Sequence, residues 1–291
     1  MNTKIEQAIL GAFVADAYLL GSHWIYDAKQ LEELSIDWES LNAPQAMWHK
    51  GKVAGDFTHY GDHCLWLLKS LQGKEAFSAQ SYAQFWQEKM KDYEGYIDGS
   101  SRETLEHLQA GKPADCGPVN HDLSICGRIA PLLQVSKNRE DFVSQAVMFA
   151  KITHNDATVL EAVHFFASLL WDVIEGKSLA LSIKEEAVNY STQIQQWIDD
   201  GIASKSADSV EVIREFGPAC GVDGGFAGTI HLLSKYSDFK SAMQANAKAG
   251  GDSSARGMIV GMILGALQEN NDFPWIEGIN NMSEIRSLIR Q

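Results

Sequence analysis

The sequence predicts an all-α fold, and three observations carry that prediction. Only 6 of the 291 residues are proline, which is rare inside helices. Alternating runs of β-branched residues, the pattern typical of strands, are few. Many windows instead repeat apolar residues three or four positions apart, the spacing of a helix that buries one face. We therefore expect helices along the whole chain.

The first helix is expected at residues 4–20. Its apolar stripe includes Ile5, Ile9 and Phe13, and Asp16 falls on the same stripe, so a carboxylate should face the interior. The same spacing predicts later helices at residues 61–72, 78–92, 101–109, 124–136, 139–151, 156–175, 180–199, 208–215, 225–235, 238–248 and 253–268.

No long Gly/Ser-rich or Pro-rich linker separates these helices, so residues 1–291 are expected to form a single domain. The longest irregular stretches, about residues 40–60 and 110–122, contain several glycines and prolines. Long loops within a helical domain more often form sites than not.

Charge and composition exclude several classes of function. The chain has 24 basic and 38 acidic residues and a formal charge of −14, which disfavours a nucleic-acid or anionic-membrane partner. The N-terminus lacks the pattern of a secretory signal, and no apolar stretch approaches the roughly 18 residues of a membrane span. Four cysteines without a CxxC pair indicate reduced thiols rather than a zinc site or disulfides. We expect a cytoplasmic protein.

The sharpest local motif is the run from Gly250 to Arg256. Paired glycines followed by Asp252, Ser253 and Ser254 are typical of a tight turn into a helix, with Asp252 or a serine as the N-cap. The same oxygen atoms could instead bind a cation or a polar ligand. The glycines that recur every four residues after this turn predict a close helix contact.

A second polar cluster covers Thr58 to His63, before an apolar helix. Asp62 lies three residues before Leu65 and therefore on or near the inward face of the first turn. It either offsets the helix dipole or takes part in chemistry, while the neighbouring histidines have no zinc-type spacing.

Two further helix starts carry polar residues, His154-Asn155-Asp156 and Ser100 with Arg102. Each group either caps its helix or binds part of a ligand, an anion or a sugar hydroxyl in the second case.

His23 lies seven residues after Asp16, on the same face if the first helix continues that far. Trp24 and Tyr26 are expected to serve in packing, although they would also suit an adenine ring. Several polar helix ends are therefore available to converge.

Taken in order, these segments resemble the ADP-ribosylglycohydrolase family from about residue 5 to residue 268. Residues 11–17 look like its opening helix, residues 60–63 stand at its Thr-Asp-Asp-Thr motif, and residues 250–255 at its Gly-Gly-Asp-x-Asp-Thr motif. Residues 127–132 and 153–154 match weaker family segments. The resemblance implies a single compact orthogonal multi-helix domain.

In active members, two divalent cations, usually magnesium or manganese, bind to those motifs and help to cleave a glycosidic bond of ADP-ribose. Here Gly61 replaces an aspartate of the first motif, and Ser254 replaces one of the second. Only Asp62 and Asp252 remain. His23 stands where another acidic residue is expected, although a small shift of the alignment would bring Asp27 to that place. The amino-acid sequence of these motifs resembles that of a branch of the family that includes the J-type crystallins and selenoprotein J.

The resemblance implies a hydrolase of an ADP-ribosyl or related nucleotide-sugar bond with a reduced metal site, holding one Mg²⁺ or Mn²⁺ ion or none. The alternative is a non-catalytic metabolite-binding or crystallin-like protein. We assign catalytic roles to Asp62, Asp252 and His23, and metal ligation to Asp62, Asp252 and Ser254. The expected substrate-binding residues are Ser100, Arg102, His154, Asn155, Asp156 and Gly251.

Overall fold

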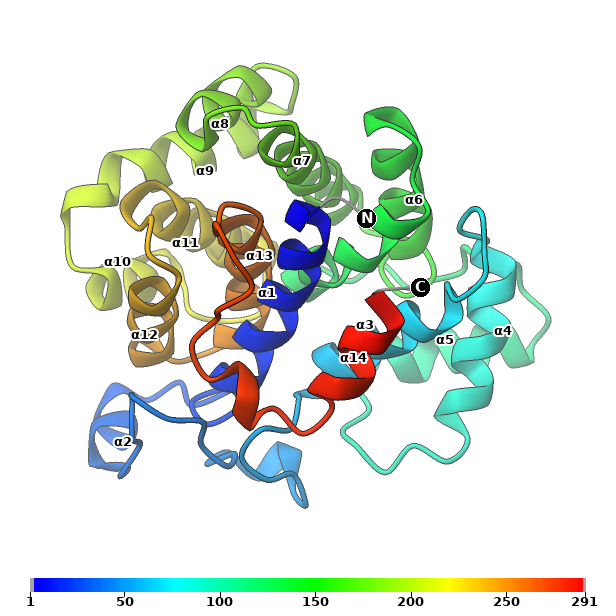
Figure 1. Cartoon of the computed structure of the whole chain (residues 1–291), viewed down its shortest axis with the longest axis horizontal. Coiled ribbons are helices and arrows are strands. Elements are labelled where there is room, and N and C mark those ends of the chain that lie inside the picture. The colour runs from blue at the N-terminus through cyan, green and yellow to red at the C-terminus, as the bar shows by residue number, and fades with distance from the viewer. Residues whose placement is uncertain (1–2, 290–291) are drawn as a thin grey trace.

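The computed structural model describes residues 3–289, and helices dominate that span (Figure 1). The α-helices are α1 (Thr3–Leu19), α2 (Ala28–Glu33), α3 (His59–Ser70), α4 (Ala79–Met90), α5 (Gly99–Gln109), α6 (Arg139–Ala150), α7 (Ala157–Ile174), α8 (Leu179–Ala187), α9 (Thr192–Ala203), α10 (Ser209–Phe216), α11 (Val222–Lys235), α12 (Phe239–Ala249), α13 (Ser253–Ala266) and α14 (Met282–Ile289). The short 3₁₀ helices are η1 (Met47–His49), η2 (Leu123–Arg128), η3 (Ala130–Gln134), η4 (Ser204–Ser206) and η5 (Ile276–Gly278). Within residues 3–289 there is no strand, only two isolated β-bridges, so the all-α prediction is confirmed.

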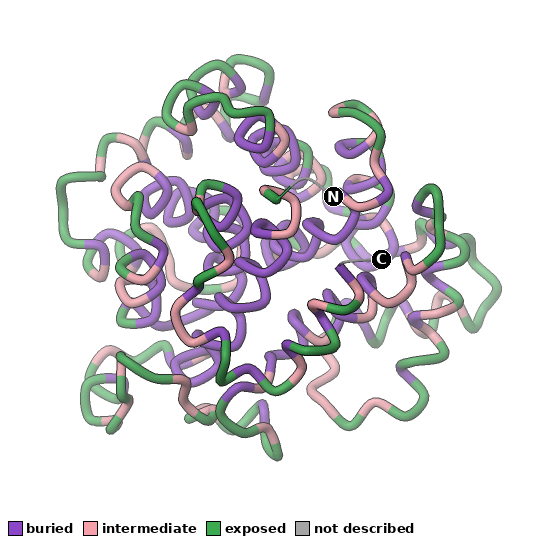
Figure 2. Tube along the Cα trace, viewed as in Figure 1, coloured by how far each residue is buried: buried purple, intermediate pink, exposed green. Residues whose placement is uncertain are grey.

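Helices α1 and α13 lie side by side at the centre of the molecule, and Figure 2 shows both as largely buried. Every residue of α13 is buried, because other helices surround it on all sides. The contact depends on glycine: a Cβ on Gly11 would collide with the backbone of Gly261, and one on Gly265 with that of Gln7. The predicted glycine edge is thus the surface along which the two helices touch.

The remaining helices pack around this central pair. Helix α7 contacts α6, α8 and α13, and α11 contacts α9, α10 and α13 (Figure 1). Among the described residues, α7 is the one helix long and apolar enough to cross a membrane, and 67% of it is buried in the molecule. The expectation that no apolar stretch reaches this length was therefore wrong, although a core helix meets the same criterion.

Two predicted helices are each divided in the structure. The segment 180–199 forms α8 and α9, because Ser191 starts a new helix by accepting a hydrogen bond from the Ile194 amide. The segment 124–136 forms two 3₁₀ helices, η2 and η3, with Pro131 at the start of the second. Helices α2 and α14 were not predicted, since both are short.

Candidate active site

Several segments that are distant in sequence converge at the N-terminus of α13. Gly250 and Gly251 have φ values of 70° and 62°, which favour glycine strongly. The Gly251 amide donates to the Ile25 carbonyl, and the Trp24 amide donates to the Gly251 carbonyl, each over 2.7 Å. The Asp252 amide donates to the Pro218 carbonyl, also over 2.7 Å. Gly251, predicted to bind substrate, thus holds the turn after α1 against α13.

Arg256 is buried beside this junction and stabilises it through hydrogen bonds from its guanidinium group. It donates to the Gly250 carbonyl over 2.6 Å, to the Pro218 carbonyl over 3.1 Å and to Asn246 Oδ1 over 3.0 Å. Burial lowers the pKa of Arg256 to about 10, so the side chain remains charged at neutral pH.

Asp252 is buried at the centre of the junction. Its Oδ1 accepts a hydrogen bond from the Ala255 amide over 3.1 Å and so caps α13, as predicted. Its Oδ2 accepts from the Tyr60 hydroxyl over 2.9 Å. His23 Nδ1 lies 3.5 Å from Asp252 Oδ1. The predicted residues Asp252 and His23 are therefore brought together.

Asp122 and Cys220 complete the cluster, and sequence reasoning did not select either of them. An isolated bridge joins Asp122 to Gly221, and the Leu123 amide donates to the Cys220 carbonyl over 2.9 Å. One ligand atom from each of Asp122, Cys220 and Asp252 lies within 4.8 Å of the others. We call these three residues the acidic cluster.

Burial makes the charged forms of the two carboxylates in the acidic cluster unfavourable. Burial, together with the charge of Asp252, raises the pKa of Asp122 to about 7. Burial also raises the pKa of Asp252. Two close, buried carboxylates with raised pKa values are less favourable when both are charged, which favours a state in which one of them is protonated. Burial and both aspartates raise the pKa of the Cys220 thiol to about 12, so it remains protonated.

A cavity of about 370 Å³ opens beside the acidic cluster. Asp122, Cys220 and Gly221 line one side of it, and the predicted substrate-binding residue Ser100 lies on another. Asn120 Nδ2 donates a hydrogen bond to the Ser100 hydroxyl. The volume lies within the range of about 300–1,000 Å³ typical of small-molecule sites.

Asp16 is fully buried, as predicted, and accepts two hydrogen bonds from Thr58. Its two carboxylate oxygens accept from the Thr58 amide over 2.8 Å and from the Thr58 hydroxyl over 2.7 Å. Burial raises the pKa of Asp16 to about 7, against the lowering effect of the hydrogen bonds from Thr58 and of the nearby Ser254 hydroxyl. Thus Ser254, predicted as a metal ligand, lies beside Asp16.

Asp62 lies apart from the acidic cluster, in a different set of contacts. Its Oδ2 accepts from Lys52 Nζ and from the Tyr93 hydroxyl, each over 2.6 Å. The side chains of Lys52 and Asp62 are 22% and 14% exposed, so the ion pair is largely shielded from water. A fixed ammonium group therefore already neutralises this carboxylate.

The other predicted substrate-binding residues are less central. Arg102 is exposed and donates to the Ile97 carbonyl over 2.5 Å. Asp156 caps α7 and lies 3.3 Å from His121, a cavity residue. His154 is buried with its Nδ1 2.9 Å from the Thr153 hydroxyl, while Asn155 is exposed.

These positions do not fit a dinuclear magnesium or manganese site. A Cβ on Gly61 would lie 2.3 Å from Asp16 Oδ2 and 2.7 Å from the Phe57 Cβ, so a carboxylate side chain fits there only if these neighbours move. The Asp62 carboxylate is paired with Lys52 Nζ, and each carboxylate oxygen of Asp16 already accepts a hydrogen bond from Thr58. Among the described residues, the acidic cluster is the one group of three such side chains able to hold an ion, and its thiol departs from the oxygen donors that Mg²⁺ prefers.

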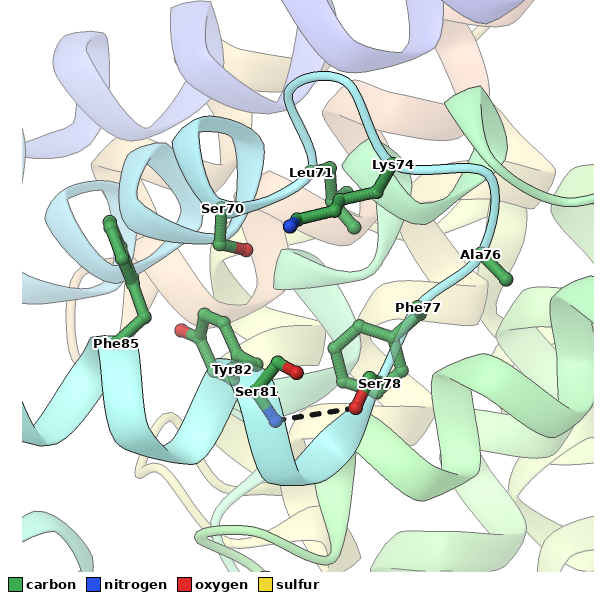
Figure 3. Close-up of a pocket in the computed structure, with 9 residues that line it drawn as sticks. All are labelled: Ser70, Leu71, Lys74, Ala76, Phe77, Ser78, Ser81, Tyr82 and Phe85. Carbon is green, nitrogen blue, oxygen red and sulfur yellow. Dashed lines mark hydrogen bonds between the residues drawn. The ribbon is translucent and has the colours of Figure 1, made fainter.

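A separate pocket of about 220 Å³ lies between the end of α3 and the start of α4 (Figure 3). Lys74, Phe77 and Tyr82 line it, and Ser78 Oγ accepts from the Ser81 amide over 3.3 Å. No carboxylate or imidazole is among its described lining residues, so it offers no group for hydrolysis.

Comparison with known proteins assigns the chain to a family. The ADP-ribosylglycohydrolase family model matches residues 2–291, so the chain belongs to the ADP-ribosylglycohydrolase family. The predicted resemblance is therefore confirmed, and membership supports a hydrolase-like protein.

Two relatives from Tripedalia cystophora agree with the predicted crystallin branch. Crystallin J1A is 23% identical over 99% of this chain and 95% of its own length. Crystallin J1B is 24% identical over 95% of this chain and 92% of its own length. A solved structure described as an ADP-ribosylglycohydrolase-related protein complex matches with a TM-score of 0.72 and 19% identity, over 98% of this chain and 96% of that one, which supports the fold.

Proposed function

We propose that this protein hydrolyses a glycosidic bond of an ADP-ribosyl or related nucleotide-sugar conjugate in the cavity beside the acidic cluster. The observation that carries the proposal is the close Asp122–Asp252 pair, in which Asp122 lines a cavity of about 370 Å³ and Asp252 is buried behind it. Most enzymes that cleave glycosidic bonds use one carboxylic acid and one carboxylate near the anomeric carbon.

In this proposal, one proton is shared between Asp122 and Asp252 near neutral pH. The protonated member donates its proton to the leaving group as the glycosidic bond breaks, and the ionised member stabilises the positive charge that develops on the ribosyl ring. Water then adds to the anomeric carbon and gives its proton back to the carboxylate that acted as the acid. His23 and Tyr60 position Asp252, since both contact its carboxylate. Ser100 and Asn120, already hydrogen-bonded to each other, would bind hydroxyl groups of the substrate.

This proposal needs no dinuclear metal centre. A single divalent ion, if one binds, would be held by Asp122, Cys220 and Asp252 and would polarise the bond being cleaved. The thiol favours a softer ion over Mg²⁺. Asp62 is excluded from ligation in this proposal, because its carboxylate is paired with Lys52.

The alternative is a non-catalytic member that binds a nucleotide or another polar metabolite. The loss of carboxylates at positions 61 and 254 and the similarity to Crystallin J1A favour this reading. It predicts binding without product.

Release of ADP-ribose from arginine-linked and serine-linked ADP-ribosyl conjugates, measured with excess chelator, separates the two proposals. We expect turnover by the wild type and a loss of about 100-fold or more in Asp122→Asn and Asp252→Asn, the scale of general acid–base catalysis. Asp238→Asn is a matched control, because Asp238 caps α12 away from the cavity. Equal product with the wild type and an Asp122→Asn/Asp252→Asn variant would contradict the catalytic proposal.

A further inference from the structure

The pocket between α3 and α4 is a second place where a ligand can bind, and it lies apart from the acidic cluster (Figure 3). Ser70, the last residue of α3, lies on one side of it, and Ser78 and Tyr82, at the start of α4, lie on the other. Tyr60, which donates a hydrogen bond to the acidic cluster, precedes Ser70 by ten residues of α3, or about 15 Å of helix. No lining residue of the pocket belongs to the acidic cluster.

Aromatic rings form much of the pocket wall. Phe77, Tyr82 and Leu71 are buried, and Phe85 is partly buried. The ring centroids of Phe77 and Tyr82 lie 6.1 Å apart. An apolar cavity of about 150 Å³ can hold benzene, so the volume of about 220 Å³ here is sufficient for one aromatic ring with a small polar substituent.

The Tyr82 hydroxyl is a buried polar group without a partner. The Tyr82 side chain is 4% exposed, and its hydroxyl makes no hydrogen bond within residues 3–289. Figure 3 shows this hydroxyl on the side of the ring toward Ser70 and Phe85, which both line the pocket. Burial raises the pKa of Tyr82, so the hydroxyl keeps its proton at neutral pH and can donate a hydrogen bond. Because an unpaired buried hydroxyl is unfavourable, it indicates a partner that occupies the pocket.

A positive charge and a helix N-terminus lie at the same pocket. Lys74, in the loop between α3 and α4, lines the pocket and makes no ion pair within the described residues. Figure 3 shows its ammonium group turned toward Ser70. Ser78 caps α4 by accepting from the Ser81 amide, which leaves other amides of the first turn without helical partners. No carboxylate is among the described lining residues, so the pocket favours an anion over a cation.

We propose that this pocket binds an aromatic monocarboxylate with a single ring, of the size of benzoate. The ring packs among Phe77, Tyr82 and Phe85, and the carboxylate accepts hydrogen bonds from the Tyr82 hydroxyl and the Lys74 ammonium group. A ligand with an ammonium group finds no carboxylate to pair with. A phosphate dianion leaves one of its two charges without a cation, since Lys74 is the one charged residue among the described lining residues.

Titration calorimetry of the wild type with benzoate and with benzamide tests the required charge. Benzamide has the same ring and a neutral amide, so we expect it to bind about tenfold more weakly than benzoate, because it cannot form a charge-assisted hydrogen bond. Equal affinities would contradict an anion site. No binding of benzoate at about 10 mM would overturn the proposal, and either result leaves the proposed hydrolysis untouched because the two sites share no residue.

Tyr82→Phe keeps the ring and removes only the hydroxyl. We expect this variant to bind benzoate about tenfold more weakly than the wild type, because a hydrogen bond to a charged group is lost. Its thermal stability without ligand should be no lower than that of the wild type, since the hydroxyl has no partner in the described part of the chain. An unchanged affinity for benzoate would overturn the proposal.

Two further variants locate the bound benzoate. Lys74→Met should weaken binding about fivefold or more, whereas Lys112→Met, which removes an exposed lysine outside the pocket, should leave the affinity unchanged. Ala76 is an exposed lining residue, so Ala76→Trp fills the pocket without disturbing the core and should abolish binding. Wild-type affinity in Ala76→Trp, or equal losses in the two lysine variants, would place benzoate elsewhere and overturn the proposal.

Discussion

The carboxylate of Asp16 occupies the space that a side chain at Gly61 would need. A Cβ at position 61 would collide with Asp16 Oδ2. It would also lie only 2.7 Å from the Cβ of Phe57. Asp16 is held in this position by two hydrogen bonds from Thr58. The loss of the aspartate at position 61 and the placement of Asp16 are therefore one packing arrangement.

Restoring a side chain at position 61 should destabilise the fold. We expect Gly61→Ala to lower the free energy of unfolding by about 1–3 kcal/mol, as overpacking of a core does. Urea unfolding measures this directly. Gly99→Ala is the matched control, because a Cβ there meets nothing within 4 Å, and it should change stability by less than about 0.5 kcal/mol. Equal stabilities of the two variants would show that Asp16 can move away.

Asp122 should make the protein less stable as the pH rises. Its pKa is 3.8 when unperturbed and about 7 in the folded protein, so the folded state binds this proton more tightly. The penalty is absent below about pH 4, grows between pH 4 and 7, and is complete above pH 7. We expect Asp122→Asn to be more stable than wild type at pH 8, with this advantage disappearing at pH 4. An advantage independent of pH would contradict the raised pKa.

The Lys52–Asp62 pair should contribute to stability. Because the pair is largely shielded and Tyr93 adds a second hydrogen bond to Asp62, we expect Asp62→Asn to cost about 1–3 kcal/mol. A double-mutant cycle with Lys52→Met should give a favourable coupling energy between the two side chains. A coupling of zero would mean that Lys52 is free and that Asp62 is available to a cation.

Arg256 should be essential to the turn before α13. Its removal in Arg256→Met takes the buried donors from the Gly250 carbonyl and from Asn246 Oδ1, and we expect a loss of about 3–5 kcal/mol. Arg286→Met breaks an ion pair whose partner Glu277 is 81% exposed and should cost less than about 1 kcal/mol. Thermal unfolding of both variants checks this difference, and similar losses would contradict it.

Local patterns in the sequence predicted much of this architecture. The period of apolar residues located most helices, and the Gly-Gly-Asp motif located the turn and the cap formed by Asp252. The inward position of Asp16 also followed from its place on an apolar stripe. The sequence pattern did not predict short helices such as α2 or the helix break at Ser191, because these features depend on tertiary contacts and capping.

The acidic cluster could not be predicted, because a backbone bridge between distant loops assembles it. Asp122 stood at the end of a predicted site-forming loop, but nothing in the sequence linked it to Cys220. Likewise, no local pattern indicates that Lys52 reaches Asp62. Such pairings depend on how the 40–60 loop lies across α3, and a one-dimensional pattern does not contain that information.

Titration calorimetry of ADP-ribose into the wild type, with excess chelator, tests the central claim most directly. The account predicts binding that persists without divalent ions, because Asp122, Ser100 and Asn120 line the proposed cavity and no dinuclear metal centre does. Binding that appears only when Mg²⁺ or Mn²⁺ is added, or no binding under either condition, would contradict it.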